Sequence, residues 1–189
     1  MEDTPIPYEL PETENHSFFF IDQRVETSFE AKLHRHDAWE LYYVVHGYGT
    51  RIAGDTLQPF SAGDVVLIPP GMFHRWIYEP DSADDDGHVR YLMSAFSHSF
   101  VERCVELFPE LRNRLSGVVY PTGALRFGAE SSRTIRKMLA EMNALDELGR
   151  LCEMLRLLPV VLPRPTILRS AAPCASSGTC GGCSISAPM

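Results

Sequence analysis

The chain contains no hydrophobic run that approaches the roughly 20 residues needed to span a bilayer, and its first residues have neither the basic start nor the apolar stretch of a secretory signal. It has no basic excess either, because 17 Lys and Arg stand against 25 Asp and Glu for a net charge of −8. This balance argues against electrostatic binding of nucleic acid or an anionic membrane by the chain as a whole. The five cysteines, an odd number, disfavour a disulfide scaffold and favour the cytoplasm.

The sequence divides into four segments of different character. Residues 1–16 are polar and contain three prolines, which predicts a flexible N-terminal arm. Residues 17–96 contain short apolar runs separated by Gly, Pro and Asp, which predicts successive strands. Residues 97–158 change to helical spacing. Residues 159–189 contain no acidic residue, two arginines and five prolines, which predicts a disordered tail.

Strands that precede helices predict a mainly β fold with C-terminal helices. Closely spaced short strands with tight turns favour a small barrel or a double-sheet roll. The helical segment 97–158 favours two or three helices packed on one side of that barrel.

Four residues form the most informative constellation, namely His34, His36, Glu40 and His74. The first three share one parity, so on a continuous strand their side chains would point to the same face. Imidazole and carboxylate groups together suit zinc, iron, manganese or nickel. A second interpretation is a metal-free pocket in which the ring nitrogens bond to Glu40 and water.

Three aromatic residues share the parity of these groups. Tyr42 follows Glu40 along the same run, and Trp76 and Tyr78 follow His74. We therefore expect a small-molecule pocket lined by His34, His36, Glu40, Tyr42, His74, Trp76 and Tyr78. No catalytic acid or base is evident beyond the two tyrosines.

The spacing of these residues resembles the two-part signature of the cupin superfamily. The first part ends at Gly47, and the second part runs from Gly63 through Pro69 and Gly71 to His74. The sequence departs from that signature at two positions. Ser28 stands where the first part opens with Gly in the family, and Tyr78 stands where the second part often closes with Asn. The resemblance implies a double-stranded β-helix (jelly-roll) barrel.

The stretches His34–Val44 and Gly63–His74 are also similar to the sensor domain of AraC-type transcription regulators. The likeness covers most of residues 17–158. This likeness implies a domain that binds a small-molecule effector, and by analogy with the family the effector would be a sugar or a sugar-like metabolite. It also implies that the domain forms a homodimer through its helices. Regulators of that type continue into a DNA-reading domain of two helix-turn-helix units, which the tail does not resemble. We therefore expect no direct DNA binding by this chain and no membrane contact, and the composition break near Leu158 is consistent with a fragment or a shifted reading frame.

The alternative function is a metal-dependent cupin enzyme, an isomerase or dioxygenase, in which three histidines and one glutamate hold the metal. The predicted subunit interface is an apolar stripe that consists of Leu148, Leu151, Leu155 and Leu158. The Cys180-x-x-Cys183 pair could indicate a zinc or redox site, but it has no second pair and no nearby histidine, which favours chance.

Overall fold

Runs of β-branched and aromatic residues separated by glycine turns form two β-sheets that face each other. The computed structural model describes residues 6–7, 16–29 and 32–163, so the predicted tail beyond 163, with Cys180 and Cys183, lies outside the described residues. The strands are β1 (Ile6–Pro7), β2 (Phe19–Glu26), β3 (His34–Arg35), β4 (Trp39–His46), β5 (Tyr48–Ala53), β6 (Thr56–Ser61), β7 (Val65–Ile68), β8 (His74–Tyr78), β9 (His88–Phe96) and β10 (Leu125–Arg126).

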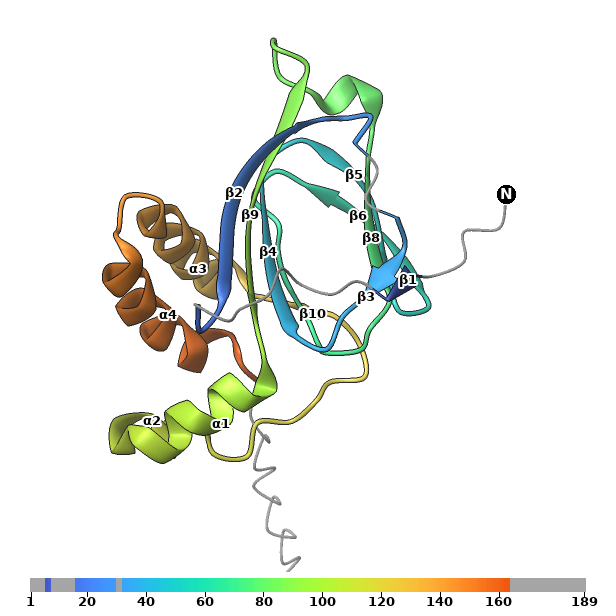
Figure 1. The fold of residues 1–189 in the computed structure, drawn as a ribbon. Coiled ribbons are helices and arrows are strands. Elements are labelled where there is room, and N and C mark those ends of the chain that lie inside the picture. Colours follow the sequence, from blue (N-terminus) through green and yellow to red (C-terminus); the bar gives the residue numbers. More distant parts are fainter. Residues whose placement is uncertain (1–5, 8–15, 30–31, 164–189) are drawn as a thin grey trace, which may run out of the picture.

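The two sheets enclose the predicted barrel. Sheet A has the strand order β1-β3-β8-β5-β6, and sheet B has the order β10-β7-β4-β9-β2 (Figure 1). β1 pairs in parallel with β3, so part of the segment predicted to be a flexible arm belongs to sheet A. β10 pairs with β7 in sheet B although it lies in the segment predicted to be helical.

Two glycines allow β5 to fit against β8. Gly47 has a φ of 108°, a conformation that L side chains rarely adopt, and it forms the turn between β4 and β5. Gly49 lies so close to β8 that an added Cβ would be 2.0 Å from the carbonyl oxygen of Ile77. The close approach of β5 and β8 therefore requires a residue without a side chain at position 49.

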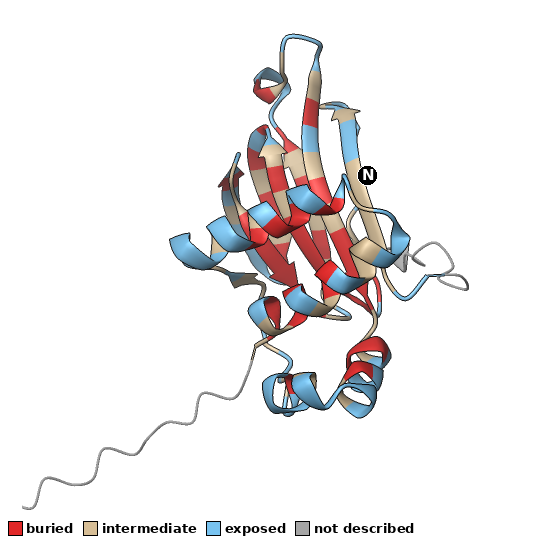
Figure 2. Ribbon diagram, turned by 90° about the vertical axis from the view of Figure 1, so that its left-hand side faces the viewer, coloured by how far each residue is buried: buried red, intermediate tan, exposed pale blue. Residues whose placement is uncertain are grey.

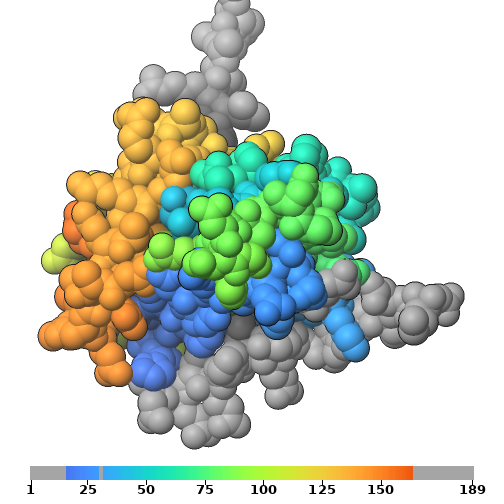
Figure 3. Space-filling view, turned by 90° about the horizontal axis from the view of Figure 1, so that it is seen from above, coloured from blue at the N-terminus to red at the C-terminus, as the bar shows by residue number. Residues whose placement is uncertain are grey.

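Helices follow the strands, as the mainly β fold with C-terminal helices predicted. They are α1 (His98–Leu107), α2 (Pro109–Leu115), α3 (Ala129–Met142) and α4 (Glu147–Val161), and a short 3-10 turn spans Pro80–Ser82. In Figure 1, α3 and α4 lie against the outer face of sheet B, whereas α1 and α2 lie beyond its end. Figure 2 looks onto these helices and shows the buried strands behind them, and Figure 3 shows the helical layer beside the barrel. None of the helices in the described part is long and apolar enough to cross a membrane.

The prediction of two or three helices is wrong, because the described residues form four. The additional helix is short and begins at Pro109. A proline at the first helical position loses nothing, since its missing N–H would have no partner there.

The predicted end of the folded part at Leu158 is also wrong. α4 continues through Pro159 to Val161, and the amide of Leu162 donates to the carbonyl of Leu158 at 3.0 Å. Val161 and Leu162 are buried against the helix core, and this burial offsets the hydrogen bond that Pro159 cannot donate.

Two hydrophobic cores share the strands of sheet B. The helix core lies between sheet B and the helices and includes Trp39, Leu41 and Leu157. The barrel core lies between the sheets and includes Tyr42, Val44, Val66, Ile68, Trp76 and Tyr78. Consecutive residues of β4 therefore alternate between the cores, as the two-residue period of a strand requires.

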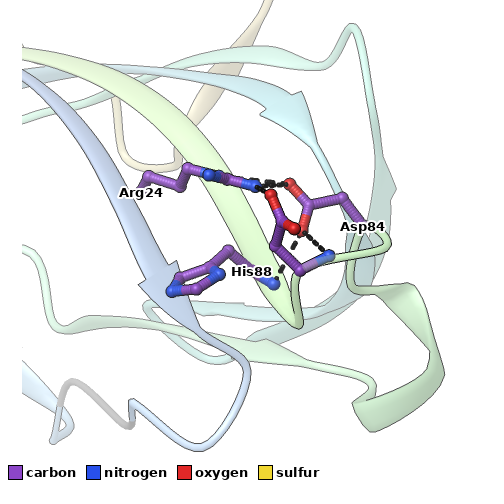
Figure 4. A network of polar contacts seen from close by, with 4 residues as sticks. Arg24, Asp84 and His88 are labelled. Atoms are coloured by element: carbon purple, nitrogen blue, oxygen red, sulfur yellow. Dashed lines mark hydrogen bonds and ion pairs between the residues drawn. The ribbon is translucent and has the colours of Figure 1, made fainter.

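The acidic loop between Asp81 and Gly87 is joined to β2 by two ion pairs of Arg24. Nη2 of Arg24 lies 2.7 Å from Oδ2 of Asp84 and 2.6 Å from Oδ2 of Asp86 (Figure 4). Oδ1 of Asp84 accepts hydrogen bonds from the backbone amides of Asp86 and His88. The bond from Arg24 and the two amides hold the pKa of Asp84 at about 2, well below its ordinary value.

Candidate functional site

The structure brings His34, His36, Glu40 and His74 together at one end of the barrel. His34 lies on β3 of sheet A, Glu40 lies on β4 of sheet B, and His36 lies in the segment that crosses between them. His74 begins β8 and pairs directly with His34. The expectation of one continuous strand is therefore wrong, because the residues converge through two facing sheets and not through parity along one strand.

The four ligand-type atoms lie within 4.8 Å of one another. Nε2 of His36 lies 3.0 Å from Oε2 of Glu40. Nε2 of His74 lies 3.3 Å from the same oxygen without hydrogen-bond geometry. His36, Glu40 and His74 are buried and His34 is half-buried, so the cluster is nearly closed to solvent.

The backbone fixes the orientation of all three imidazole rings. Nδ1 donates to the carbonyl of Lys32 in His34, of Ala38 in His36 and of Met72 in His74, at 2.8, 3.2 and 2.8 Å. A carbonyl oxygen only accepts, so each Nδ1 carries a hydrogen, and a metal in the cluster would bind the rings through Nε2. Metal-binding histidines are held in this way.

The charges within the cluster are coupled. Burial raises the pKa of Glu40, but the charge of His74 and the hydrogen bond from His36 outweigh it, so that the pKa is well below its ordinary value. Burial lowers the pKa of His74, but the charge of Glu40 outweighs it and raises the pKa. Burial and the charge of His74 lower the pKa of His34. A cation therefore belongs beside Glu40, either a proton on His74 or a metal.

The donor set fits a divalent transition metal. His34, His36 and His74 would supply imidazole nitrogens and Glu40 a carboxylate oxygen, a combination that suits zinc, iron, manganese or nickel. The buried and unsatisfied Nε2 of His74 is the kind of atom that such an ion would satisfy.

The predicted aromatic residues lie behind this cluster in the barrel core. The rings of Tyr42 and Trp76 stack with centroids 4.1 Å apart, and the hydroxyls of Tyr42 and Tyr78 lie 3.2 Å apart. Burial raises the pKa of both tyrosines, so these hydroxyls remain neutral. The predicted pocket residues therefore gather at one end and in the interior of the barrel, and their role in binding remains a prediction.

Sequence reasoning missed Arg51. This residue on β5 is 1% exposed and stands opposite Trp76 of β8. The signal was available, because residue 51 has the same parity as Gly49 and Ala53, which also face the interior.

The predicted interface stripe mainly serves the helix core. Leu158 is fully buried in that core, which contradicts its assignment to an interface. Leu151 and Leu155 are partly buried against the same core. Leu148 is 69% exposed and borders a groove of about 390 Å³, which the start of α4 forms with residues 16–20.

Comparison with known protein families gives a match over most of the chain. The profile of the family described as AraC-like ligand binding domain matches residues 15–158. This range contains both described sheets except β1, and it ends within α4.

The similar individual proteins are distant. A stretch of 54 residues is 35% identical to a 1-hydroxy-2-naphthoate 1,2-dioxygenase from a Nocardioides species, and it covers 29% of this chain but only 14% of that enzyme. The crystal structure of an apo ToxT variant from Vibrio cholerae is 12% identical with a TM-score of 0.51, covering 77% of this chain and 54% of that one. A cupin 2 conserved barrel protein from Salinispora arenicola is 24% identical with a TM-score of 0.38, covering 50% of this chain and 76% of that one.

Proposed function

Because the chain belongs to the AraC-like ligand-binding domain family, we propose that it is the effector-sensing part of an AraC-type transcription regulator. The observation that carries this proposal is the polar and aromatic lining of the barrel core, in which Tyr42, Trp76 and Tyr78 lie behind the histidine cluster. A core built only for stability would favour aliphatic residues, whose packing needs no hydrogen-bond partners. The interior therefore suits a small molecule that has both polar and apolar parts.

The alternation of β4 between the two cores supplies a route for regulation. Tyr42 faces the barrel core, whereas Leu41 beside it packs in the helix core. A ligand that shifts β4 changes the surface on which the helices rest. It then favours one helix arrangement by its differential affinity for the two states.

We expect small molecules to stabilise the protein through Trp76. A metabolite panel should contain a compound that raises the melting temperature, because a ligand at a hundred times its Kd adds about 2.7 kcal/mol to the free energy of unfolding. Trp76→Ala should abolish the shift, whereas Leu57→Ala, at an exposed position on β6, should keep it. Shifts of equal size in wild type and Trp76→Ala, or no shift with any compound, would contradict the proposal.

We also propose that the domain forms a homodimer through the exposed start of α4. Leu148 is a large apolar side chain that is 69% exposed beside the groove, and a second copy would cover it. Light scattering should report a dimer for the wild type and a monomer for Leu148→Glu, while Glu147→Gln keeps the dimer. A wild-type monomer, or a dimeric Leu148→Glu, would remove this interface.

The second candidate function is a metal-dependent cupin enzyme. The observation that favours it is the cluster of His34, His36, Glu40 and His74 with its orienting carbonyl bonds. The dioxygenase stretch agrees with this candidate, although it spans a small part of that enzyme. Elemental analysis of the purified protein tests this candidate, since an enzyme of this class requires a stoichiometric metal and a metal-free protein would exclude it.

A further inference from the structure

Arg51 places a charged group inside the barrel with most of its hydrogen-bond donors unused. Its Nη2 donates to Oε1 of Gln58 at 3.2 Å. Its Nε and Nη1 are buried and have no hydrogen-bond partner among the described residues. A buried charge without full compensation is strongly unfavourable, so it needs an explanation beyond packing.

The pairing of the strands shows where this guanidinium lies. Arg51 pairs with Trp76 of β8 on one side and with Gln58 of β6 on the other. Directly paired residues project from the same face of a sheet, and Trp76 belongs to the barrel core. Nε1 of Trp76 is also buried without a partner among the described residues. Two neighbouring strands therefore present unused donors to the same interior.

The carboxylates near the barrel are already engaged. Asp64 acts on Arg51 from a distance and partly opposes the lowering of its pKa by burial, but Oδ1 of Asp64 lies 3.3 Å from Nη2 of Arg126. Glu40 is held by His36 and His74. The described part of the chain thus supplies no carboxylate in contact with Arg51.

We propose that the effector is an organic monocarboxylate whose carboxylate group binds Arg51 and the indole N–H of Trp76. This inference rests on the proposed sensing function and narrows its ligand class. A guanidinium presents two edges with two donors each, and Gln58 uses a single donor, so one complete edge remains for the two oxygens of a carboxylate.

The charge of the site selects a monoanion. One guanidinium neutralises one negative charge, whereas a phosphate ester carries a charge of about −1.5 to −2 and would leave part of it uncompensated in a buried site. The stacked rings of Tyr42 and Trp76 offer an apolar surface to the remainder of the acid.

The test compares acids with their neutral amides on the full chain. Acetate and benzoate are titrated against acetamide and benzamide while the melting temperature is followed. At least one acid should stabilise the wild type more than its amide. Arg51→Met should weaken binding of that acid roughly a hundredfold, because one partner of a buried charge pair is removed. The ligand-free Arg51→Met protein should melt at or above the wild-type temperature, because an uncompensated buried charge is gone.

Two further variants keep the test decisive. Arg51→Lys retains the charge without the two-donor edge, and it should bind the acid more weakly than the wild type even if Arg51→Met does not fold. Arg133→Met, at an exposed position on α3, should bind like the wild type. Equal binding by wild type and both Arg51 variants, or no stabilisation by either acid, overturns the proposal. Binding of a neutral metabolite that requires Trp76 but not Arg51 would contradict the carboxylate class of the effector and leave the sensing function standing. If no compound binds, both proposals fail.

Discussion

Replacement of Gly49 by valine is expected to unfold the barrel or to lower its free energy of unfolding by at least about 3 kcal/mol, the upper part of the usual range for overpacking. An added Cβ would lie 2.0 Å from the carbonyl oxygen of Ile77 and 2.9 Å from the Cα of Tyr78. Both obstacles are backbone atoms, so no side-chain rotation relieves the clash. β8 must separate from β5, which displaces Trp76 and Tyr78 from the barrel core.

Gly123 provides the matched control. A Cβ added there meets nothing within 4 Å, and the residue does not have a positive φ. Gly123→Val should therefore change the free energy of unfolding by no more than about 0.5 kcal/mol. Urea denaturation of both variants measures the difference, and similar midpoints for the two would show that β5 and β8 do not approach as closely as described.

Replacement of Glu40 by glutamine should cost about 3–5 kcal/mol of stability where His74 is protonated, because it leaves a buried imidazolium without its counter-ion. The pH range of this effect follows from the pKa shifts of His74 and Glu40. The raised pKa of His74 gives stability that is complete below its ordinary value of 6.5 and is lost as the pH rises through the folded value. The lowered pKa of Glu40 gives stability that is complete above 4.5 and is lost as the pH falls through the folded value. The pair therefore contributes most between pH 4.5 and 6.5.

Denaturation of the metal-free protein across this range checks the result, with the exposed Glu26→Gln as the control. The cost of Glu40→Gln should shrink above the folded pKa of His74, where the ring can lose its proton. A constant cost at every pH would contradict the charge coupling.

The same cluster has the opposite pH dependence if it holds a metal. Neutral imidazoles are required as ligands, so affinity for a first-row divalent ion should fall as the pH drops through the raised pKa of His74. The variant that combines His36→Ala with His74→Ala should abolish that affinity.

The order of the elements was readable from the sequence because turn residues separate short apolar runs. The cluster of His34, His36, Glu40 and His74 was also readable, although the reasoning behind it was partly wrong. Parity along one strand suggested that the first three residues meet, whereas the chain passes from sheet A to sheet B between Arg35 and Trp39. Sheet switching depends on pairing with distant strands, which local periodicity does not encode.

The structure also differs from the sequence-based prediction at Leu158 and Arg51, again because distant contacts decide which residues are covered. Leu158 lies on an apolar helix face, but that pattern does not say whether a second subunit or the chain's own core covers the face, and here the chain's own core covers it. Arg51 was passed over because a single arginine in an alternating strand usually faces solvent. Its inward position follows from the parity that it shares with Gly49 and Ala53 and from its pairing with Trp76.

The two-sided burial of β4 also bears on how such domains diversify in evolution. Tyr42 and Val44 face the barrel, whereas Leu41 and Tyr43 support the helices. If the barrel binds the effector as we propose, selection for a new effector acts on the first pair, and the second pair stays under the separate demand of helix packing. Specificity can therefore drift at every second residue of one strand while the helical layer is inherited unchanged.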